Sequence, residues 1–215
     1  MQFTDPKVAA VFADYHERHQ RELELTRDLP RASFGERRDE FLLPVGAAVG
    51  AFLHALVVGR KAARVLELGT SYGYSTLFLA DAARECGAKI VSIDIDASKQ
   101  AYAAQMLEKA GLVEHVEFRC GDALELLAGD AGPYDVVLLD IWKNLYLPCF
   151  EAVYPLLAEE GAIVSDNMIY PESAREAVRA YRQAVHTKPD LQSVLLPLGS
   201  GIELSVKWST DSAKL

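Results

Sequence analysis

The chain has 215 residues, half of them hydrophobic and a quarter charged, which is typical of a soluble globular protein. This length suits one α/β domain and is too short for two ordinary ones, so we expect a single domain over residues 1–215. The net charge of -9 argues against nucleic acid as a partner, because phosphate binding needs clustered lysine and arginine. Neither a secretory signal nor a run of ~18 apolar residues for a membrane helix is visible. We therefore expect a cytoplasmic protein without a membrane partner.

The N-terminal part of the chain is expected to be helical. Residues 6–28 form a polar helical segment that starts with proline, a residue suited to the first turn of a helix. Residues 27–40 are charged and interrupted by proline and glycine, which predicts a loop or short helical turns. A second helix is expected from about residue 45 to residue 58. Residues 1–60 would thus form a helical cap, and residues 61–215 the core.

From residue 63 onward, short apolar runs alternate with amphipathic segments of helical length. The runs that indicate strands are Arg64–Leu68, Lys89–Asp94, Val116–Arg119, Asp135–Asp140 and Gly161–Asp166. Helices are expected near residues 75–86, 98–110, 145–158 and 173–186. Continuous apolar strands separated by helices predict a mostly parallel, doubly wound α/β sheet that helices cover on both faces.

The end of the chain breaks this alternation. Residues 191–198 and 202–208 are two further strand-like runs, joined only by Gly199-Ser200-Gly201. Three residues are too few for the crossover that two parallel strands require. We expect an antiparallel hairpin that completes a seven-stranded sheet.

The first strand leads into a turn with the sequence Glu67-Leu68-Gly69-Thr70-Ser71-Tyr72-Gly73-Tyr74-Ser75. A glycine after a strand lets the backbone approach a ligand closely, and the next helix presents free N–H groups to it. The phosphate-binding P-loop would need Gly-Lys-Ser/Thr here, and the dinucleotide pattern would need glycine in place of Ser71. Glu67 would repel a pyrophosphate but would suit a cationic, amino-acid-like ligand. The alternative is an ordinary tight turn between a strand and a helix.

Acidic residues also end the next two predicted strands. Asp94 lies where an acid commonly binds ribose hydroxyls, and Asp122 is placed to meet an adenine amino group. The alternative for each is a helix N-cap, although Asp96 or Ser98 are better cap candidates than Asp94. The carboxyl ends of parallel strands border the crevice in which such folds bind ligands. The three acids together therefore favour S-adenosylmethionine as the ligand.

These residues resemble the cation-dependent O-methyltransferases, a family that includes catechol and caffeoyl-coenzyme A O-methyltransferases. Residues 65–75 are similar to the first motif of the family, and the likeness extends from about Leu43 to Trp208. The resemblance implies a Rossmann-like class I methyltransferase fold. The turn, the strand ends and the resemblance together predict which residues bind the cofactor. These are Val45, Glu67, Gly69, Tyr72, Gly73, Ser75, Asp94, Asp122, Ala123 and Asp140.

Two later motifs carry the same resemblance. Residues 139–148, Leu-Asp-Ile-Trp-Lys-Asn-Leu-Tyr-Leu-Pro, look like the catechol-type sequence, and the pair Asp166-Asn167 follows the fifth predicted strand. The resemblance implies that Asp140, Asp166 and Asn167 bind a divalent cation, usually magnesium. Oxygen ligands suit such a hard cation. The alternative is that both aspartates are loop or capping residues.

The resemblance also implies a small aromatic acceptor. Trp142 and Pro171 would flank its ring, and Lys143 would be the general base, since a metal nearby disfavours the charged form of lysine. The alternatives are a tryptophan that closes the core and a solvated lysine. Catechol-specific members carry a further carboxylate on the penultimate strand, but residues 191–198 contain no acid. The predicted acceptor is therefore a catechol-like or other aromatic compound with vicinal hydroxyls.

The assembly and two other functions stay open. The long polar N-terminal helix suggests bacterial members of the family, many of which are homodimers, and residues 31–43 would cover the acceptor pocket or form a dimer contact. The first other function is a metal-independent methyltransferase that acts on a macromolecule. The second is a cofactor-binding module without catalysis.

Overall fold

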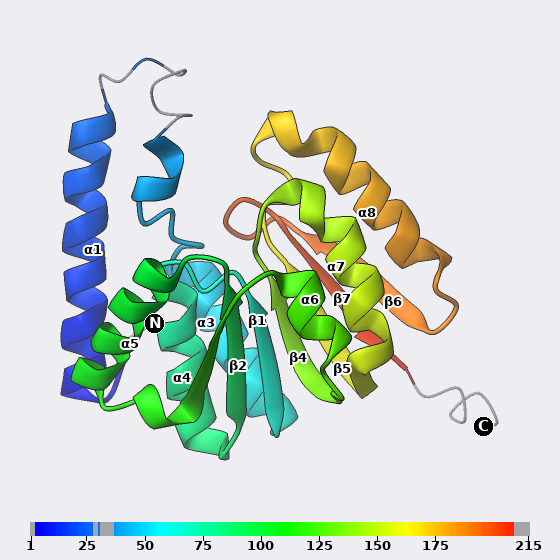
Figure 1. Ribbon diagram of the computed structural model, residues 1–215, viewed down its shortest axis with the longest axis horizontal. Coiled ribbons are helices and arrows are strands. Elements are labelled where there is room, and N and C mark those ends of the chain that lie inside the picture. Colours follow the sequence, from blue (N-terminus) through cyan, green and yellow to red (C-terminus); the bar gives the residue numbers. More distant parts are fainter. Residues whose placement is uncertain (1–2, 28–29, 31–36, 209–215) are drawn as a thin grey trace.

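The computed structural model describes residues 3–27, 30 and 37–208. In this part of the chain seven strands form one sheet in the order β3-β2-β1-β4-β5-β7-β6 (Figure 1). The strands are β1 Arg64–Leu68, β2 Lys89–Asp94, β3 Val116–Cys120, β4 Tyr134–Leu139, β5 Leu157–Ser165, β6 Leu191–Leu196 and β7 Ile202–Lys207. Strands β1 to β5 pair in parallel, whereas β7 is antiparallel to both β5 and β6. The predicted doubly wound sheet with a C-terminal antiparallel hairpin is confirmed.

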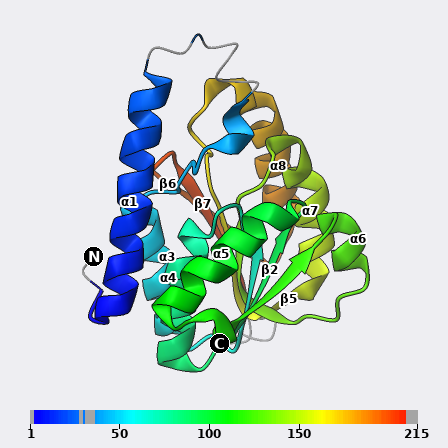
Figure 2. The ribbon, with the colours of Figure 1, turned by 60° about the vertical axis from the view of Figure 1, so that its left-hand side comes forward.

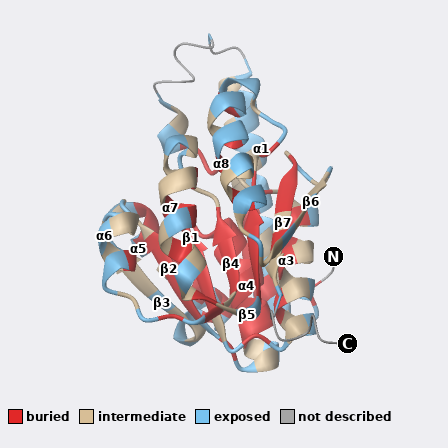
Figure 3. Cartoon of the chain, turned by 90° about the vertical axis from the view of Figure 1, so that its right-hand side faces the viewer, coloured by how far each residue is buried: buried red, intermediate tan, exposed pale blue. Residues whose placement is uncertain are grey.

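Helices cover both faces of this sheet. The described helices are α1 Pro6–Thr26, α3 Ala47–Arg60, α4 Tyr74–Cys86, α5 Ala97–Ala110, α6 Ala123–Ala128, α7 Tyr146–Val153 and α8 Arg175–Thr187. Short 3-10 turns are η1 Arg38–Glu40, η2 Val113–His115, η3 Lys143–Leu145, η4 Tyr154–Leu156 and η5 Glu172–Ala174. Helices α3, α4 and α5 pack on one face, with α1 outside α4 and α5, and α6, α7 and α8 pack on the other (Figures 1 and 2). Figure 3 shows the buried strands between these two layers.

Side chains of the central strands alternate between two hydrophobic cores, because successive residues of a strand point to opposite faces. In β1, Val65 belongs to the core beneath α3 and α4, and Leu66 belongs to the core beneath α7 and α8. Val136 and Val137 of β4 divide in the same way. Burial on both faces explains why these strands have continuous apolar sequences.

Prolines move two of the predicted boundaries. The segment 145–158 is not one helix: α7 is followed by η4, and β5 begins at Leu157. Pro155 lacks the N–H that would continue the α-helical hydrogen bonding. Strand β6 ends at Leu196, before Pro197, for the corresponding reason that proline donates no hydrogen bond to a β ladder.

Helix α6 is absent from the sequence prediction. Asp122 caps it, since its carboxylate accepts hydrogen bonds from the N–H groups of Leu124 and Glu125 at 2.8 and 3.2 Å. The N-cap alternative for Asp122 thus describes this side chain in the structure. Asp96, one of the better cap candidates, caps α5.

The N-terminal helices lie close to their predicted ranges. Helix α1 ends two residues earlier than predicted, and α3 starts two residues later because Gly46, with a φ of +89°, precedes it. The turn η1 lies in the segment predicted to be a loop or short turns, of which residues 28–29 and 31–36 lie outside the described residues. Among the described helices, none combines the length and the apolar character that crossing a membrane requires.

Candidate active site

The turn after β1 approaches the end of β4 closely. Gly69 has a φ of +102°, and a Cβ atom there would lie 2.0 Å from the backbone oxygen of Asp140. Gly73 has a φ of +86°, and its Cβ would lie 2.6 Å from the Cβ of Ala103 on α5. Both positions combine a backbone conformation that favours glycine with a neighbour that leaves no room for a side chain. The turn therefore requires both glycines.

Glu67 lies beneath this turn. Its side chain is fully buried and accepts hydrogen bonds from the hydroxyls of Ser75, Thr76 and Ser92 at 2.6, 2.7 and 2.6 Å. Burial raises the pKa of the Glu67 carboxyl to about 7, although the three hydroxyls act to lower it. In this structure both carboxylate oxygens bind hydroxyls, so Glu67 positions Ser75 at the start of α4. Its predicted contact with a cationic ligand stays a prediction.

Asp94 supports the turn from the end of β2. Its Oδ2 accepts a hydrogen bond from the N–H of Ser71 at 2.7 Å, and its Oδ1 accepts one from the N–H of Asp96 at 2.9 Å. Asp94 is therefore not a helix cap. Its predicted contact with ribose stays a prediction, as does the adenine contact of Asp122.

Helix α1 holds the outer side of the turn. The hydroxyl of Tyr15 donates to the carbonyl of Tyr72 at 2.6 Å, and the guanidinium of Arg18 lies 3.8 Å from the centre of the Tyr72 ring. The Tyr72 hydroxyl in turn donates to the carbonyl of Glu40 at 3.2 Å. The N-terminal helix is thus in direct contact with the predicted cofactor turn.

A small cavity of about 30 Å³ lies between the turn and the segment that leads into α3. Five of the predicted cofactor residues form part of its wall: Val45, Gly69, Tyr72, Ser75 and Asp140. Residues Leu42, Leu43, Pro44, Thr70, Ser71 and Tyr74 complete the wall. The other predicted cofactor residues, Glu67, Gly73, Asp94, Asp122 and Ala123, are not part of it.

Two of the predicted metal ligands follow neighbouring strands. Strands β4 and β5 pair with Leu139 opposite Ser165. Asp140 and Asp166 directly follow these two residues, so both lie at the same edge of the sheet. Asp166 is 2% exposed, and its buried Oδ1 has no hydrogen-bond partner among the described residues. Burial and, second, the negative charge of Asp140 raise the pKa of the Asp166 carboxyl. Asn167 follows with a φ of +58°, a conformation that asparagine tolerates well.

This arrangement fits a cation. An unpartnered carboxylate oxygen is costly to bury, and a second carboxylate nearby adds repulsion. A divalent cation would remove both costs, and carboxylate and amide oxygens are ligands that Mg²⁺ accepts.

Lys143 lies beside the Asp140 carboxylate and is linked through Tyr146 to the backbone carbonyl of Asp166. Its Nζ lies 3.5 Å from Oδ1 of Asp140, and it donates to the carbonyl of Ile141 and to the hydroxyl of Tyr146. The buried Tyr146 hydroxyl donates in turn to the carbonyl of Asp166 at 3.0 Å. Burial lowers the pKa of the Lys143 ammonium, while the charges of Asp140 and Asp166 act to raise it. The lysine is therefore held in place beside the carboxylates rather than solvated at the surface.

A second, larger cavity lies beside Lys143. Its volume is about 520 Å³, a size typical of small-molecule sites. Its wall contains all three predicted substrate residues, Trp142, Lys143 and Pro171, together with Arg38, Asn144, Ser173, Ala174, Glu176, Ala177 and Ala180. Trp142 is 48% exposed, so it does not close the core. Because Asp140 borders the first cavity and Lys143 the second, this ion pair lies between the two cavities.

Comparison with known proteins identifies the family. Residues 16–208 match the family model described as O-methyltransferase. The chain belongs to the O-methyltransferase family. Caffeoyl-CoA O-methyltransferase 5 of Nicotiana tabacum is 30% identical over 184 residues, which cover 76% of each chain. Catechol O-methyltransferase of Niastella koreensis is 34% identical over 124 residues, which cover 56% of each.

A solved structure agrees in fold with this O-methyltransferase. The crystal structure of an O-methyltransferase from Bacillus cereus in complex with SAH has a TM-score of 0.73 and 23% identity, and the match covers 92% of this chain and 90% of that one. The predicted enzyme class, an S-adenosylmethionine-dependent O-methyltransferase, is confirmed.

Sequence reasoning missed four residues at the site of this O-methyltransferase: Tyr15, Arg18, Arg38 and Tyr146. Tyr15 and Arg18 reach the turn from a helix more than fifty residues earlier, and no local pattern announces such a contact. Arg38 lies on the wall of the larger cavity, 5.4 Å from the centre of the Trp142 ring. Only Tyr146 could have been found from the sequence, because it follows Lys143 by three residues at the start of a helix, a spacing that brings two side chains together.

Proposed function

We propose that this enzyme transfers the methyl group of S-adenosylmethionine to a hydroxyl oxygen of a small aromatic acceptor with vicinal hydroxyls, and that a divalent cation, best matched by Mg²⁺, takes part. One domain over residues 1–215 would hold all three. The observation that carries the proposal is the buried Oδ1 of Asp166, which has no hydrogen-bond partner in the described part of the chain and lies close to Asp140 and Lys143, between the two cavities.

The cofactor would bind at the glycine turn, where the cavity of about 30 Å³ would hold only a small part of it. Val45, Gly69, Tyr72, Ser75 and Asp140 would contact it directly, because they form the wall. Glu67 and Gly73 would act through the shape of the turn, whereas Asp94, Asp122 and Ala123 would extend the site along the ends of β2 and β3.

The cation and the acceptor would lie on the other side of Asp140. Asp140, Asp166 and Asn167 would hold the cation, which would lower the pKa of a phenol bound to it and orient its oxygen. Lys143 would accept the proton of the attacking hydroxyl at Nζ. The oxygen would then take the methyl group from the sulfonium in one direct displacement, in which the sulfur–methyl bond breaks and the sulfur leaves as a neutral thioether; the rate of such a step depends on positioning.

The acceptor class follows from the cavity and from the relatives. Trp142 and Pro171 give the 520 Å³ cavity apolar walls for a ring. By their names, the relatives act on caffeoyl-CoA and on catechol, aromatic compounds with adjacent hydroxyls. Strand β6 offers no carboxylate for a second hydroxyl, so catechol itself is not singled out.

The test is methyl transfer to a panel of catechols, flavonoids and hydroxycinnamoyl thioesters, with Mg²⁺ or with a chelator. Wild type, Asp166→Asn and Lys143→Met are compared, with Asp14→Asn, an exposed change on α1, as the control. We expect the chelator and Asp166→Asn to abolish turnover. Lys143→Met should lower kcat by about 10²–10⁴ and leave the affinity for S-adenosylmethionine unchanged in calorimetry.

Other outcomes would identify other functions. Turnover that is unaffected by the chelator and by Asp166→Asn would contradict the metal assignment and favour a metal-independent enzyme. Binding of S-adenosylmethionine without turnover on the whole panel would favour a cofactor-binding module. We also propose a cytoplasmic homodimer, as the resemblance to bacterial members implies; sedimentation at the mass of one chain would contradict the dimer.

A further inference from the structure

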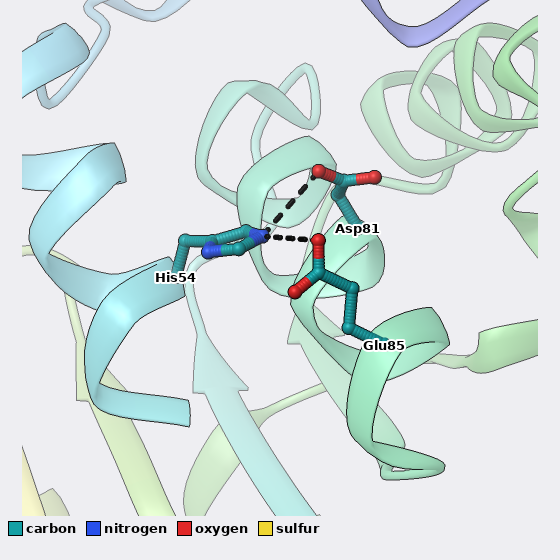
Figure 4. Close-up of side chains that lie close together, drawn as sticks. All are labelled: His54, Asp81 and Glu85. Carbon is teal, nitrogen blue, oxygen red and sulfur yellow. Dashed lines mark ion pairs between the residues drawn. The ribbon is translucent and has the colours of Figure 1, made fainter. Parts of the chain in front are cut away.

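A second group of possible ligands lies between α3 and α4, away from the cavities described above. His54 projects from α3 toward Asp81 and Glu85, which lie one turn apart on α4 (Figure 4). Asp81 and Glu85 follow Ser75 by six and ten residues, which places them about 9 and 15 Å further along the helix from the cofactor cavity. None of the three lines either cavity.

Among the residues that the structure describes, none forms a hydrogen bond with Nε2 of the imidazole, although that atom is buried. Its distances are 3.4 Å to Oδ2 of Asp81 and 3.7 Å to Oε1 of Glu85. Hydrogen bonds between nitrogen and oxygen are usually about 2.7–3.2 Å long, so the three groups converge without bonding. Leaving a buried ring nitrogen unpaired costs free energy.

The spacing matches a metal centre. In a tetrahedral zinc site the ligand atoms lie about 2.0–2.2 Å from the ion, which separates them from one another by about 3.3–3.6 Å. The two distances from Nε2 fall in or next to this range, and all three ligand atoms lie within 4.8 Å of one another. One imidazole and two carboxylates are also a ligand set that zinc uses.

The surroundings supply orientation and charge. Arg84 donates to the other oxygen of Asp81 at 2.5 Å and to Asp5 at 2.6 Å, so the Asp81 carboxylate is held with Oδ2 left for His54. Such outer partners commonly fix metal ligands. With His54 neutral, three carboxylates and one guanidinium give this group a net charge of −2, which a divalent cation balances.

We propose that His54, Asp81 and Glu85 form a structural Zn²⁺ site that joins α3 to α4. Glu85 is 47% exposed, which leaves a path for the ion and room for water as a fourth ligand. The site would brace two helices whose N-terminal ends lie at the cofactor cavity. It is independent of the cation proposed for Asp140 and Asp166.

The test is calorimetric titration of the full chain with Zn²⁺, because binding can be read without activity. Wild type, His54→Gln, Glu85→Gln and Asp166→Asn are compared. We expect His54→Gln to lose one equivalent of Zn²⁺ that Asp166→Asn retains, and Glu85→Gln to weaken that binding at least about tenfold. Zn²⁺ should also raise the Tm of wild type and of Asp166→Asn, but not that of His54→Gln.

His115→Gln is the matched control, because that histidine lies beside a single carboxylate, Glu114, at 3.9 Å. It should bind Zn²⁺ as wild type does. Glu85→Gln tests the site even if His54→Gln fails to fold, because Glu85 is half exposed and its replacement should leave the fold intact. Equal Zn²⁺ binding by wild type and His54→Gln, or no equivalent that survives Asp166→Asn, would overturn the proposal and leave an ion pair between protonated His54 and the two carboxylates.

Discussion

Replacement of Glu67 by glutamine is expected to remove a pH-dependent loss of stability. Burial raises the pKa of Glu67 from the ordinary 4.5 to about 7 in the folded protein. Between these two pH values the folded protein holds a proton that the unfolded chain has released. Raising the pH therefore favours unfolding, and the penalty is complete once the pH exceeds about 7. Glutamine carries no charge and avoids it.

The magnitude follows from the pKa change. At about 1.36 kcal/mol for each pKa unit, the penalty approaches roughly 3 kcal/mol, of which about 2.5 kcal/mol develops between pH 5 and pH 8. The full burial of Glu67 means that solvent does not screen this effect. The amide of glutamine can still bond with the hydroxyls of Ser75, Thr76 and Ser92, because a hydroxyl can donate or accept.

The measurement is urea unfolding at several pH values from 5 to 8, in chelator and without cofactor. The free energy of unfolding of Glu67→Gln minus that of wild type should rise by about 2.5 kcal/mol across this range. Glu108→Gln, an exposed change on α5, serves as the control and should follow wild type. Parallel pH curves for wild type and Glu67→Gln would show that Glu67 ionises in the folded protein as it does in the unfolded chain, and would refute the reasoning.

Three further substitutions test the packing around the site. Gly69→Ala forces a Cβ against the Asp140 carbonyl, so it should lower the free energy of unfolding by at least about 2 kcal/mol and abolish cofactor binding. If calorimetry showed that the variant binds S-adenosylmethionine as wild type does, the turn would not require glycine at this position. Tyr15→Phe removes the hydrogen bond to Tyr72, so the free energy of unfolding should fall by about 1 kcal/mol and the Kd for S-adenosylmethionine should rise. An unchanged Kd would mean that this contact of α1 does not influence cofactor binding. Phe78→Ala empties a fully buried position and should cost about 3–5 kcal/mol in urea unfolding, whereas a cost below about 1 kcal/mol would mean that the core closes over the gap.

The sheet and the residues gathered at its carboxyl edge were predictable because their signals are local. Apolar runs marked each strand, and a three-residue connection allowed only an antiparallel partner for the last one. Parallel strands share one carboxyl edge, so Gly69, Asp94, Asp140 and Asp166 could be placed together without coordinates. Boundaries were less well predicted where a proline such as Pro155 stops a helix before its apolar pattern ends.

Side-chain direction depended on the tertiary structure. The sequence by itself placed Glu67 near the end of β1. The direction of its carboxylate depends in part on the buried hydroxyl of Ser92, twenty-five residues away on β2, which donates a hydrogen bond to it. Tyr15 meets Tyr72 across 57 residues, a contact that only the docking of α1 creates. Likewise, whether Oδ1 of Asp166 has a hydrogen-bond partner depends on the atoms that its neighbours present, and none of the described residues offers one. Local sequence determines strands and turns because their hydrogen bonds and glycine conformations are local, whereas burial and pairing of polar atoms depend on residues that folding alone brings together.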